Sequence, residues 1–369
     1  MGSTRIYGDL SNSMSCVYDP ESGNISSSIL ICLDREIEVN PIMPPEWAVD
    51  GKQRYCFGNT NDKIVNRLSA NYYLDVSGLI ERRFWPKGES YSDIASEEID
   101  STILMISYRL SSIVGAITDN YRTSFPLTGG VDSRILAACC HQHINKVDNF
   151  HTHILNYATA NDARVGGLIA AKLNVQHEFY DGRKLTARPR AVRRRVNRFH
   201  AQTGFEVPVL HDITTNLYRH PPRGHVLLRG NVMELLRAQH WKGRKNGGEI
   251  NHQFGIKRCL FTSGPLFKSF ISKWDEDYRL WLSQFDYSLQ DKYIDIGFIE
   301  QNLPNFGKLS LGFDSSFFLS PFNDRSLFRL TVRFPIEYRS TMQASIALIS
   351  KNRPDLLDIP YGKELMRKI

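Results

Sequence analysis

The fold class follows from one strand–turn–helix segment, Phe125-Pro126-Leu127-Thr128-Gly129-Gly130-Val131-Asp132-Ser133-Arg134. The short apolar run 124–127 predicts a buried strand, and residues 133–143 have the composition of a helix. Two adjacent glycines let the backbone approach an anion closely, because glycine has no side chain in the way. The helix N-terminus that follows adds the positive end of its dipole. The segment therefore predicts a phosphate-binding turn.

The side chains of this turn predict a metal as well. Thr128 and Ser133 supply hydroxyl donors, whereas Asp132 would be repelled by a polyphosphate unless a cation lay between them. The alternative is a plain glycine turn in which Asp132 caps the helix. The residues expected to bind the phosphates are Leu127, Thr128, Gly129, Gly130, Val131, Asp132, Ser133, Arg134 and, further along the chain, Gly230.

Strand and helix patterns alternate around this segment. A β-rich stretch at 147–155, a helix at 162–173 and a short strand at 177–180 follow it, and 226–228 runs into the helix-like stretch 233–241. This rhythm predicts an α/β fold with a doubly wound parallel sheet. Beyond residue 265 the pattern is mainly helical. A helix over 92–120 follows an irregular N-terminal module, so we expect two domains, 1–90 and 91–369.

Composition indicates a folded, soluble chain. Of 369 residues, 41% are hydrophobic and 23% are charged, which excludes disordered and fibrous classes. No run approaches the roughly 18 apolar residues of a membrane span, so we expect a cytoplasmic protein with no membrane partner. The six cysteines contain no C-x-x-C pair. His141, His143, His151 and His153 lack carboxylate partners and are expected to be structural.

One stretch is strongly basic. Arg183 to Arg198 contains eight basic residues and no acidic one, in a chain whose net charge is +7. It could bind phosphate, nucleic acid or an acidic peptide, or it could be a solvated helix face. Against a simple nucleic-acid-binding helix, it has no interleaved aromatic residues and Pro189 interrupts it. Nucleic acid therefore stays a less favoured partner.

The turn lacks the lysine of G-x-x-x-x-G-K-[ST] and the spacing of G-x-G-x-x-G. It resembles the S-G-G-x-D-S loop of the PP-loop ATP pyrophosphatases, with Thr128 in place of the first serine. Residues 68–86, 229–238 and 321–363 are similar to segments of the asparagine-synthetase-like branch, which includes β-lactam synthetases and lasso-peptide cyclases. The resemblance covers 68–369 and implies an adenine nucleotide α-hydrolase-like fold.

This resemblance implies an AMP-forming amide-bond synthetase that uses ATP and Mg²⁺. A substrate carboxylate, on a small molecule or a peptide, attacks the α-phosphorus, and an amine donor then opens the acyl-adenylate. Asp132 and Glu234 would hold the metal, and Lys363 would stabilise the α-phosphate. Asp324 would orient the amine or cap a helix, and Arg134 would reach a phosphate or pair with a neighbouring acid.

The chain departs from that family at several positions. Gly2 follows Met1 where full-length asparagine synthetases have a cysteine nucleophile, and Cys16 lacks a free α-amine as its base, so glutamine hydrolysis is not expected. Ammonia, a small amine or an intramolecular amine would then be the nucleophile. Met233 stands where the family has a second aspartate, and Gly230 where it has an acid/base residue. Two alternatives therefore stay open, a tRNA-modifying PP-loop enzyme and a nucleotide-binding scaffold without catalysis.

Overall fold

A computed structural model describes residues 4–43, 55–184, 187–203, 222–243, 250–260, 265–305 and 316–362. The chain forms two compact units. The first contains 1–92, 196–208 and 240–312, and the second contains 93–195, 209–239 and 313–369. The break after residue 92 lies close to the expected boundary at 90, but the second unit does not extend unbroken over 91–369.

Residues 240–312 join the first unit because their helices share buried contacts with the N-terminal residues. The Cys56 thiol donates to the Cys259 carbonyl at 3.3 Å, and the Phe57 amide donates to Gln301 Oε1 at 2.7 Å. The Phe57 ring also packs against Trp274 and other aromatic side chains. The helical part that the sequence assigned to the synthetase domain thus completes the core of the N-terminal unit.

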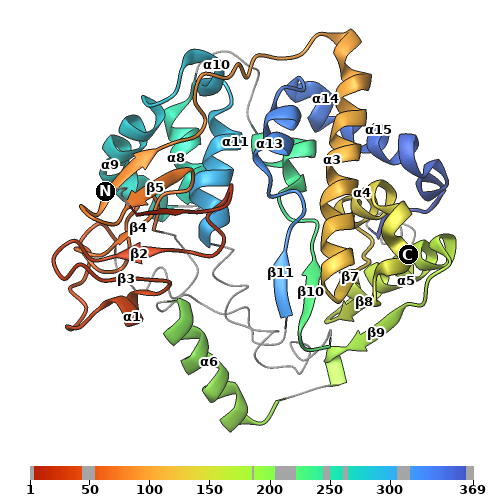
Figure 1. Cartoon of the computed structure of the whole chain (residues 1–369), viewed down its shortest axis with the longest axis horizontal. Coiled ribbons are helices and arrows are strands. Elements are labelled where there is room, and N and C mark those ends of the chain that lie inside the picture. The colour runs from red at the N-terminus through yellow and green to blue at the C-terminus, as the bar shows by residue number, and fades with distance from the viewer. Residues whose placement is uncertain are drawn as a thin grey trace. The chain divides into compact units, whose positions relative to one another are not determined.

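The second unit is mixed α/β and is built on a five-stranded parallel sheet with the order β11-β10-β7-β8-β9 (Figure 1). Four of these strands coincide closely with the expected ones, and β11 lies in the region expected to be helical. The strands are β7 Thr123–Pro126, β8 Asn149–Ile154, β9 Glu178–Asp181, β10 His225–Leu228 and β11 Ser316–Leu319.

The order of the strands reverses beside β7. The chain runs outward from β7 through β8 to β9, and it then returns to form β10 on the other side of β7. Because β7 and β10 are parallel neighbours, their carboxyl ends meet at one edge of the sheet. In open parallel sheets, ligands bind at that edge where the strand order reverses. The turns that begin at Leu127 and Arg229 follow these two strands.

Helices of the second unit pack on one another and on the sheet. α4 (Val131–Cys139) contacts both α3 (Ile99–Asn120) and α15 (Gln343–Asn352), while α5 (Tyr157–Leu173) packs on β8. The helical stretch 96–120 is long and apolar enough to cross a membrane by length and composition alone. Eight residues of α3 are buried, as expected for a helix packed on its neighbours. The cytoplasmic location stays a prediction.

Four expected helices differ from the observed ones, and one of them, expected over 162–173, begins earlier, at Tyr157. The helix expected over 92–120 begins with a 3₁₀ turn at Ser96 and becomes α-helical at Ile99. The one expected over 133–143 ends at Cys139, and a 3₁₀ helix, η2 (His141–Lys146), follows it. The stretch 233–241 forms two 3₁₀ helices, η5 (Met233–Arg237) and η6 (Gln239–Trp241). The residues Val232 and Ala238, which flank η5, have left-handed backbone conformations that end any longer helix.

The first unit contains two small antiparallel sheets, β1-β5-β6 and β3-β2-β4, and a group of helices. The strands are β1 Arg5–Tyr7, β2 Val17–Tyr18, β3 Ile25–Ser26, β4 Asn66–Arg67, β5 Tyr72–Asp75 and β6 Ile80–Arg83. The helices are α1 Ile29–Cys32, α8 His252–Leu260, α9 Pro265–Leu282, α10 Tyr287–Gln290, α11 Tyr293–Gly297 and a π-helical turn at Phe298–Asn302.

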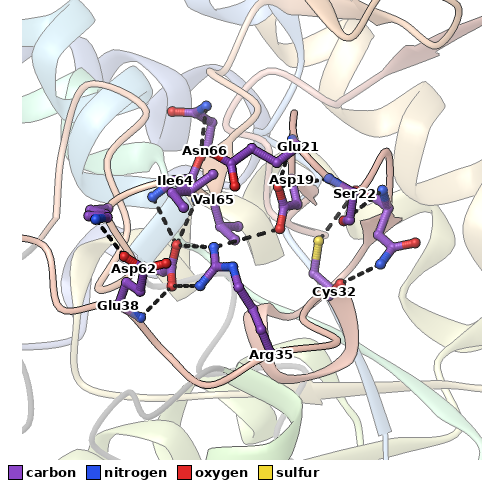
Figure 2. Close-up of polar contacts among 12 residues, drawn as sticks. Asp19, Glu21, Ser22, Cys32, Arg35, Glu38, Asp62, Ile64, Val65 and Asn66 are labelled. Atoms are coloured by element: carbon purple, nitrogen blue, oxygen red, sulfur yellow. Dashed lines mark hydrogen bonds and ion pairs between the residues drawn. The ribbon is translucent and has the colours of Figure 1, made fainter.

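Two buried carboxylates tie this unit together. Glu300 accepts two hydrogen bonds from Arg83, at 2.7 and 2.9 Å, and others from Asn71 and Trp281. Asp62 accepts two from Arg35, at 2.8 and 2.9 Å, and three from backbone amides (Figure 2). A buried carboxylate that accepts this many hydrogen bonds stabilises the structure, because both of its oxygen atoms have donors.

Candidate functional site

The glycine turn between β7 and α4 is closed by its own hydroxyl groups. Thr128 Oγ1 and Ser133 Oγ lie 3.0 Å apart, and Ser133 Oγ also accepts from the Thr128 amide at 3.3 Å. The Gly130 amide donates to Thr128 Oγ1 at 3.3 Å. Gly129 is buried and Gly130 is exposed. The two hydroxyls predicted to donate to phosphate therefore hold the shape of the turn in this structure.

Asp132 does not cap the helix. The N-cap of α4 is Gly130, which makes no side-chain cap, and Asp132 lies in the first turn. Its carboxylate pairs with Arg237 of η5, with Nε–Oδ1 and Nη2–Oδ2 distances of 3.1 and 2.6 Å. Burial raises the pKa of Asp132, and the charge of Arg237 offsets that effect only in part. The pair joins the turns that follow β7 and β10.

Glu234 lies close enough to feel the charge of Asp132. Burial, and then repulsion from Asp132, raises the pKa of Glu234 to about 7. Its Oε2 is buried and has no hydrogen-bond partner among the described residues. Arg237, three residues further along the same 3₁₀ helix, donates to Asp132 and makes no hydrogen bond to Glu234 in the described structure. An orphaned carboxylate oxygen beside a second carboxylate suits a hard cation, since Mg²⁺ prefers oxygen ligands.

The backbone that presents Glu234 is strained. Val232, just before η5, has a φ of 74°, a conformation that a β-branched residue rarely adopts and that costs about 1–3 kcal/mol. Buried Arg339 holds the turn by donating to the Leu235 carbonyl at 3.0 Å, and Ser320 donates to the Asn231 carbonyl. Met233 is fully buried, so it contributes packing rather than a ligand.

Gly230 marks the closest approach of the two turns. A Cβ added there would lie 2.8 Å from Asp132 Cβ and 3.1 Å from the Asp132 carbonyl carbon, which is shorter than side chains tolerate. Only glycine therefore fits between β10 and the start of α4. Gly230 stands where the similar family has an acid/base residue. In this structure its lack of a side chain allows the two turns to approach each other closely.

The C-terminal segment lies directly on the glycine turn. The Gly362 amide donates to the Gly129 carbonyl at 3.1 Å, and a Cβ on Gly129 would lie 2.6 Å from Asp162 Oδ1 of α5. Lys363, the predicted catalytic lysine, follows Gly362 and lies outside the described residues. The described chain therefore brings the residue before Lys363 to the turn. Sequence reasoning missed Asp162, which stands in an otherwise unremarkable helix.

Arg134 makes contacts that the sequence did not predict. Its side chain is fully buried, and it donates to the carbonyls of Leu356, Ile359 and Pro360 at 3.2, 2.6 and 3.1 Å. The guanidinium also lies 4.1 Å from the centre of the Tyr361 ring. Arg134 thereby anchors the segment that leads to Gly362.

Asp324 acts as a helix cap. Its Oδ1 accepts from the Leu327 amide at 3.0 Å at the start of α13 (Arg325–Val332), and its Oδ2 pairs with Arg109 at 2.7 Å. Of the two roles left open for Asp324, the structure displays the cap. Both partners hold it at the helix terminus, which leaves the proposed contact with an amine without support from this geometry.

The remaining candidates do not gather into a site. His151 and His153 on β8 pack with the Tyr180 ring, and His141 and His143 lie in η2. Over the ranges that the structure describes, no group of three or more His, Cys, Asp or Glu side chains could hold a metal ion. Burial raises the pKa of the Cys16 thiol to about 11, so this cysteine is a poor nucleophile.

The basic stretch is helical over α6 (Pro189–Thr203). Pro189 occupies its first position, where the missing amide costs no hydrogen bond, so the proline starts the helix instead of interrupting it. Four arginines in and just before the helix are exposed, namely Arg188, Arg190, Arg193 and Arg194. Arg183 instead pairs with Asp181 at 2.7 Å. The exposed arginines present positive charge to solvent.

We compared the sequence with protein families and with curated proteins. No family model matches the chain, and no curated protein matches it.

Proposed function

We propose that the chain is an ATP- and Mg²⁺-dependent, AMP-forming amide-bond synthetase of the asparagine-synthetase-like kind. The observation that carries this proposal is the convergence of three segments at the edge of the sheet beside β7. They are the glycine turn, the Glu234–Arg237 turn after β10 and the segment that ends at Gly362. On this proposal the five-stranded parallel sheet is the core of a doubly wound, adenine nucleotide α-hydrolase-like fold.

The residues present fit a nucleotide and its metal ion. The amides of Gly129, Gly130 and Val131 lie at the N-terminus of α4, where an anion is stabilised by backbone N–H groups. Asp132 and Glu234 would hold Mg²⁺, and the unpartnered Oε2 of Glu234 supports this assignment. When bound, the metal would neutralise the charge that develops on the departing pyrophosphate.

The chain's own residues would orient the reaction. The α4 N-terminus would hold the pyrophosphate end of ATP, and Arg237 would add a positive charge beside it. Lys363 would stabilise the negative charge on the α-phosphate and on the adduct formed when an amine attacks the acyl-adenylate. The amine would be ammonia, a small amine or an amine on the substrate itself.

The test is to incubate the purified chain with Mg-ATP and pooled small-metabolite and peptide extracts, and to measure AMP and pyrophosphate. We expect both products in equal amounts, and we expect Asp132→Asn to abolish them. Fractionation of the extract would then lead to the carboxylate substrate. ATP binding without AMP under any extract would contradict the proposal and would favour the scaffold without catalysis.

One observation favours a second function. The exposed arginines of α6 suit a nucleic-acid backbone, as in an RNA-modifying PP-loop enzyme. Cys139 and Cys140 are both buried, and burial raises the pKa of Cys139 to about 12, so neither suits the sulfur chemistry of many such enzymes. AMP formation that requires tRNA alone would support this alternative and would refute the amide synthetase.

A further inference from the structure

The Asp132–Arg237 pair has a consequence for how the site would take up its ligands. Each oxygen of Asp132 accepts one hydrogen bond from the guanidinium, at 3.1 and 2.6 Å. A divalent cation on the same carboxylate would also be repelled by the guanidinium charge at short range. Arg237 must therefore release Asp132 before that carboxylate can hold a cation well.

Building on the proposed function, we propose that Arg237 is a positioning residue that couples cation binding to polyphosphate binding. In the nucleotide-free chain it neutralises Asp132, and with nucleotide bound it turns to the polyphosphate and leaves Asp132 and Glu234 to the cation. Guanidinium groups bind phosphate oxygens in the same two-pronged geometry as carboxylates, so a polyphosphate offers Arg237 an equivalent partner.

The local structure supports an exchange of partners. The Arg237 side chain is 19% exposed, so it borders solvent instead of being enclosed in the core. It ends η5 and is followed by Ala238, whose φ of 42° stops the helix immediately after it. Glu234, one turn earlier, keeps an unpartnered oxygen although Arg237 is its neighbour in the helix. Arg237 thus pairs with one of two neighbouring carboxylates, and Glu234 Oε2 has no donor among the described residues.

This arrangement makes a specific thermodynamic prediction. Removing the guanidinium takes away the positive charge that pairs with Asp132, so the affinity for a divalent cation alone should rise. The same change removes a phosphate partner, so the affinity for metal-free nucleotide should fall. Coupling between two ligands of one protein is reciprocal and typically amounts to 5–150-fold. A variant that merely damaged the fold would weaken both affinities together.

The experiment compares the full-length chain with Arg237→Gln. Mn²⁺ alone is the cation probe, measured by the electron paramagnetic resonance of the free ion. α,β-Methylene-ATP in EDTA is the nucleotide probe, measured by calorimetry. We expect Arg237→Gln to bind Mn²⁺ about tenfold more tightly and the metal-free nucleotide about tenfold more weakly. Arg237→Lys keeps the charge without the two-pronged geometry, and both of its affinities should lie between those of the other two proteins.

Arg279→Gln is the matched control. It removes another arginine–aspartate pair, in α9 of the first unit, in which Arg279 Nε donates to Asp275 Oδ2 at 2.6 Å. We expect this variant to leave both affinities unchanged. An unchanged Mn²⁺ affinity in Arg237→Gln, or a parallel loss of both affinities, would overturn the inference. If wild type still forms AMP, only the role of Arg237 fails, whereas a wild type that binds no nucleotide refutes the proposed function as well.

Should Arg237→Gln fail to fold, the lysine variant and its Mn²⁺ affinity decide the question. An affinity equal to that of wild type would then count against the role of Arg237.

Discussion

Each unit contains an aspartate paired with an arginine through two hydrogen bonds, and the two aspartates differ in every other respect. In the first unit, the Asp62 side chain is 0% exposed and accepts five hydrogen bonds, two from Arg35 and three from backbone amides (Figure 2). In the second, the Asp132 side chain is 24% exposed, and within the described part of the chain its hydrogen bonds come from Arg237 alone.

The pKa values separate these two sites further. Burial alone would raise the pKa of Asp62, but Arg35 and the backbone amides hold it well below its usual range. Burial raises the pKa of Asp132 in spite of Arg237, and the charge of Asp132 in turn raises the pKa of Glu234. A carboxylate whose lone pairs are all used stabilises the fold. A carboxylate that is buried, accepts few hydrogen bonds and lies next to another acid can still bind a cation.

The largest expected effect comes from removing each aspartate in turn. Asp62→Asn removes a buried charge that accepts five hydrogen bonds and leaves Arg35 only the more distant Asp19, at 3.7 Å, so we expect a loss of about 3 kcal/mol in the free energy of unfolding. Asp132→Asn removes a charge that the fold disfavours, so we expect a change within about 1 kcal/mol. Urea unfolding of the two variants, followed by circular dichroism, measures both values. Equal losses would show that the two pairs play the same role.

The sequence predicted the parts of the fold that depend on local pattern. The glycine turn stands between β7 and α4 as expected, because glycine is disfavoured inside helices and strands and a glycine pair between two such patterns therefore marks a turn. β11 was missed because its four residues, Ser316–Leu319, are too short to show a period among helical neighbours. Only their pairing with β10 defines them as a strand. The grouping of 240–312 with the first unit is likewise a matter of tertiary contacts.

The sequence indicated several residues that come together at the sheet edge, but it did not indicate which side chains pair there. Asp132, Glu234 and Gly230 come together at the sheet edge, as the motif and the order of strands imply. The partner of Asp132 was not foreseen, since an arginine 105 positions away is indistinguishable in sequence from a surface residue. For Arg134 the sequence left a phosphate or a neighbouring acid as partners, and the hydrogen bonds it donates to C-terminal carbonyls were not foreseen, because only the folded chain brings those carbonyls to it.

A smaller, pH-dependent effect should distinguish Glu234 from Asp62. The folded pKa of Glu234, about 7, lies above its ordinary value of 4.5, so the folded state binds more protons between these values. Wild type should therefore lose stability relative to Glu234→Gln as the pH rises from about 4.5 to 7. Asp62 has the opposite sign, because its folded pKa is lowered and its stabilisation is lost only as the pH falls through the acid range.

The measurement for Glu234 is the thermal midpoint of both proteins in EDTA at pH 5 to 8. The charged groups identified around Glu234 are Asp132 and Arg237, and the charge of Arg237 lowers the pKa of Glu234. In the Arg237→Gln background, the difference between the two midpoints should therefore change more steeply with pH. A difference between the midpoints that stays constant over this range would contradict the raised pKa of Glu234.

The smallest effect is expected at a third aspartate–arginine pair, Asp324 with Arg109, whose side chains are 19% and 50% exposed. Asp324→Asn keeps the cap on α13, because asparagine is as good an N-cap as aspartate and exposed ion pairs contribute little. We expect it to change the free energy of unfolding by less than about 0.5 kcal/mol and to leave AMP formation intact, whereas Asp324→Ala should cost about 1 kcal/mol through the lost cap. Product assays beside urea unfolding check both variants. If Asp324→Asn folded normally but formed no AMP, the carboxylate of Asp324 would be needed for the reaction, as that of Asp132 is, and capping alone would not explain its role.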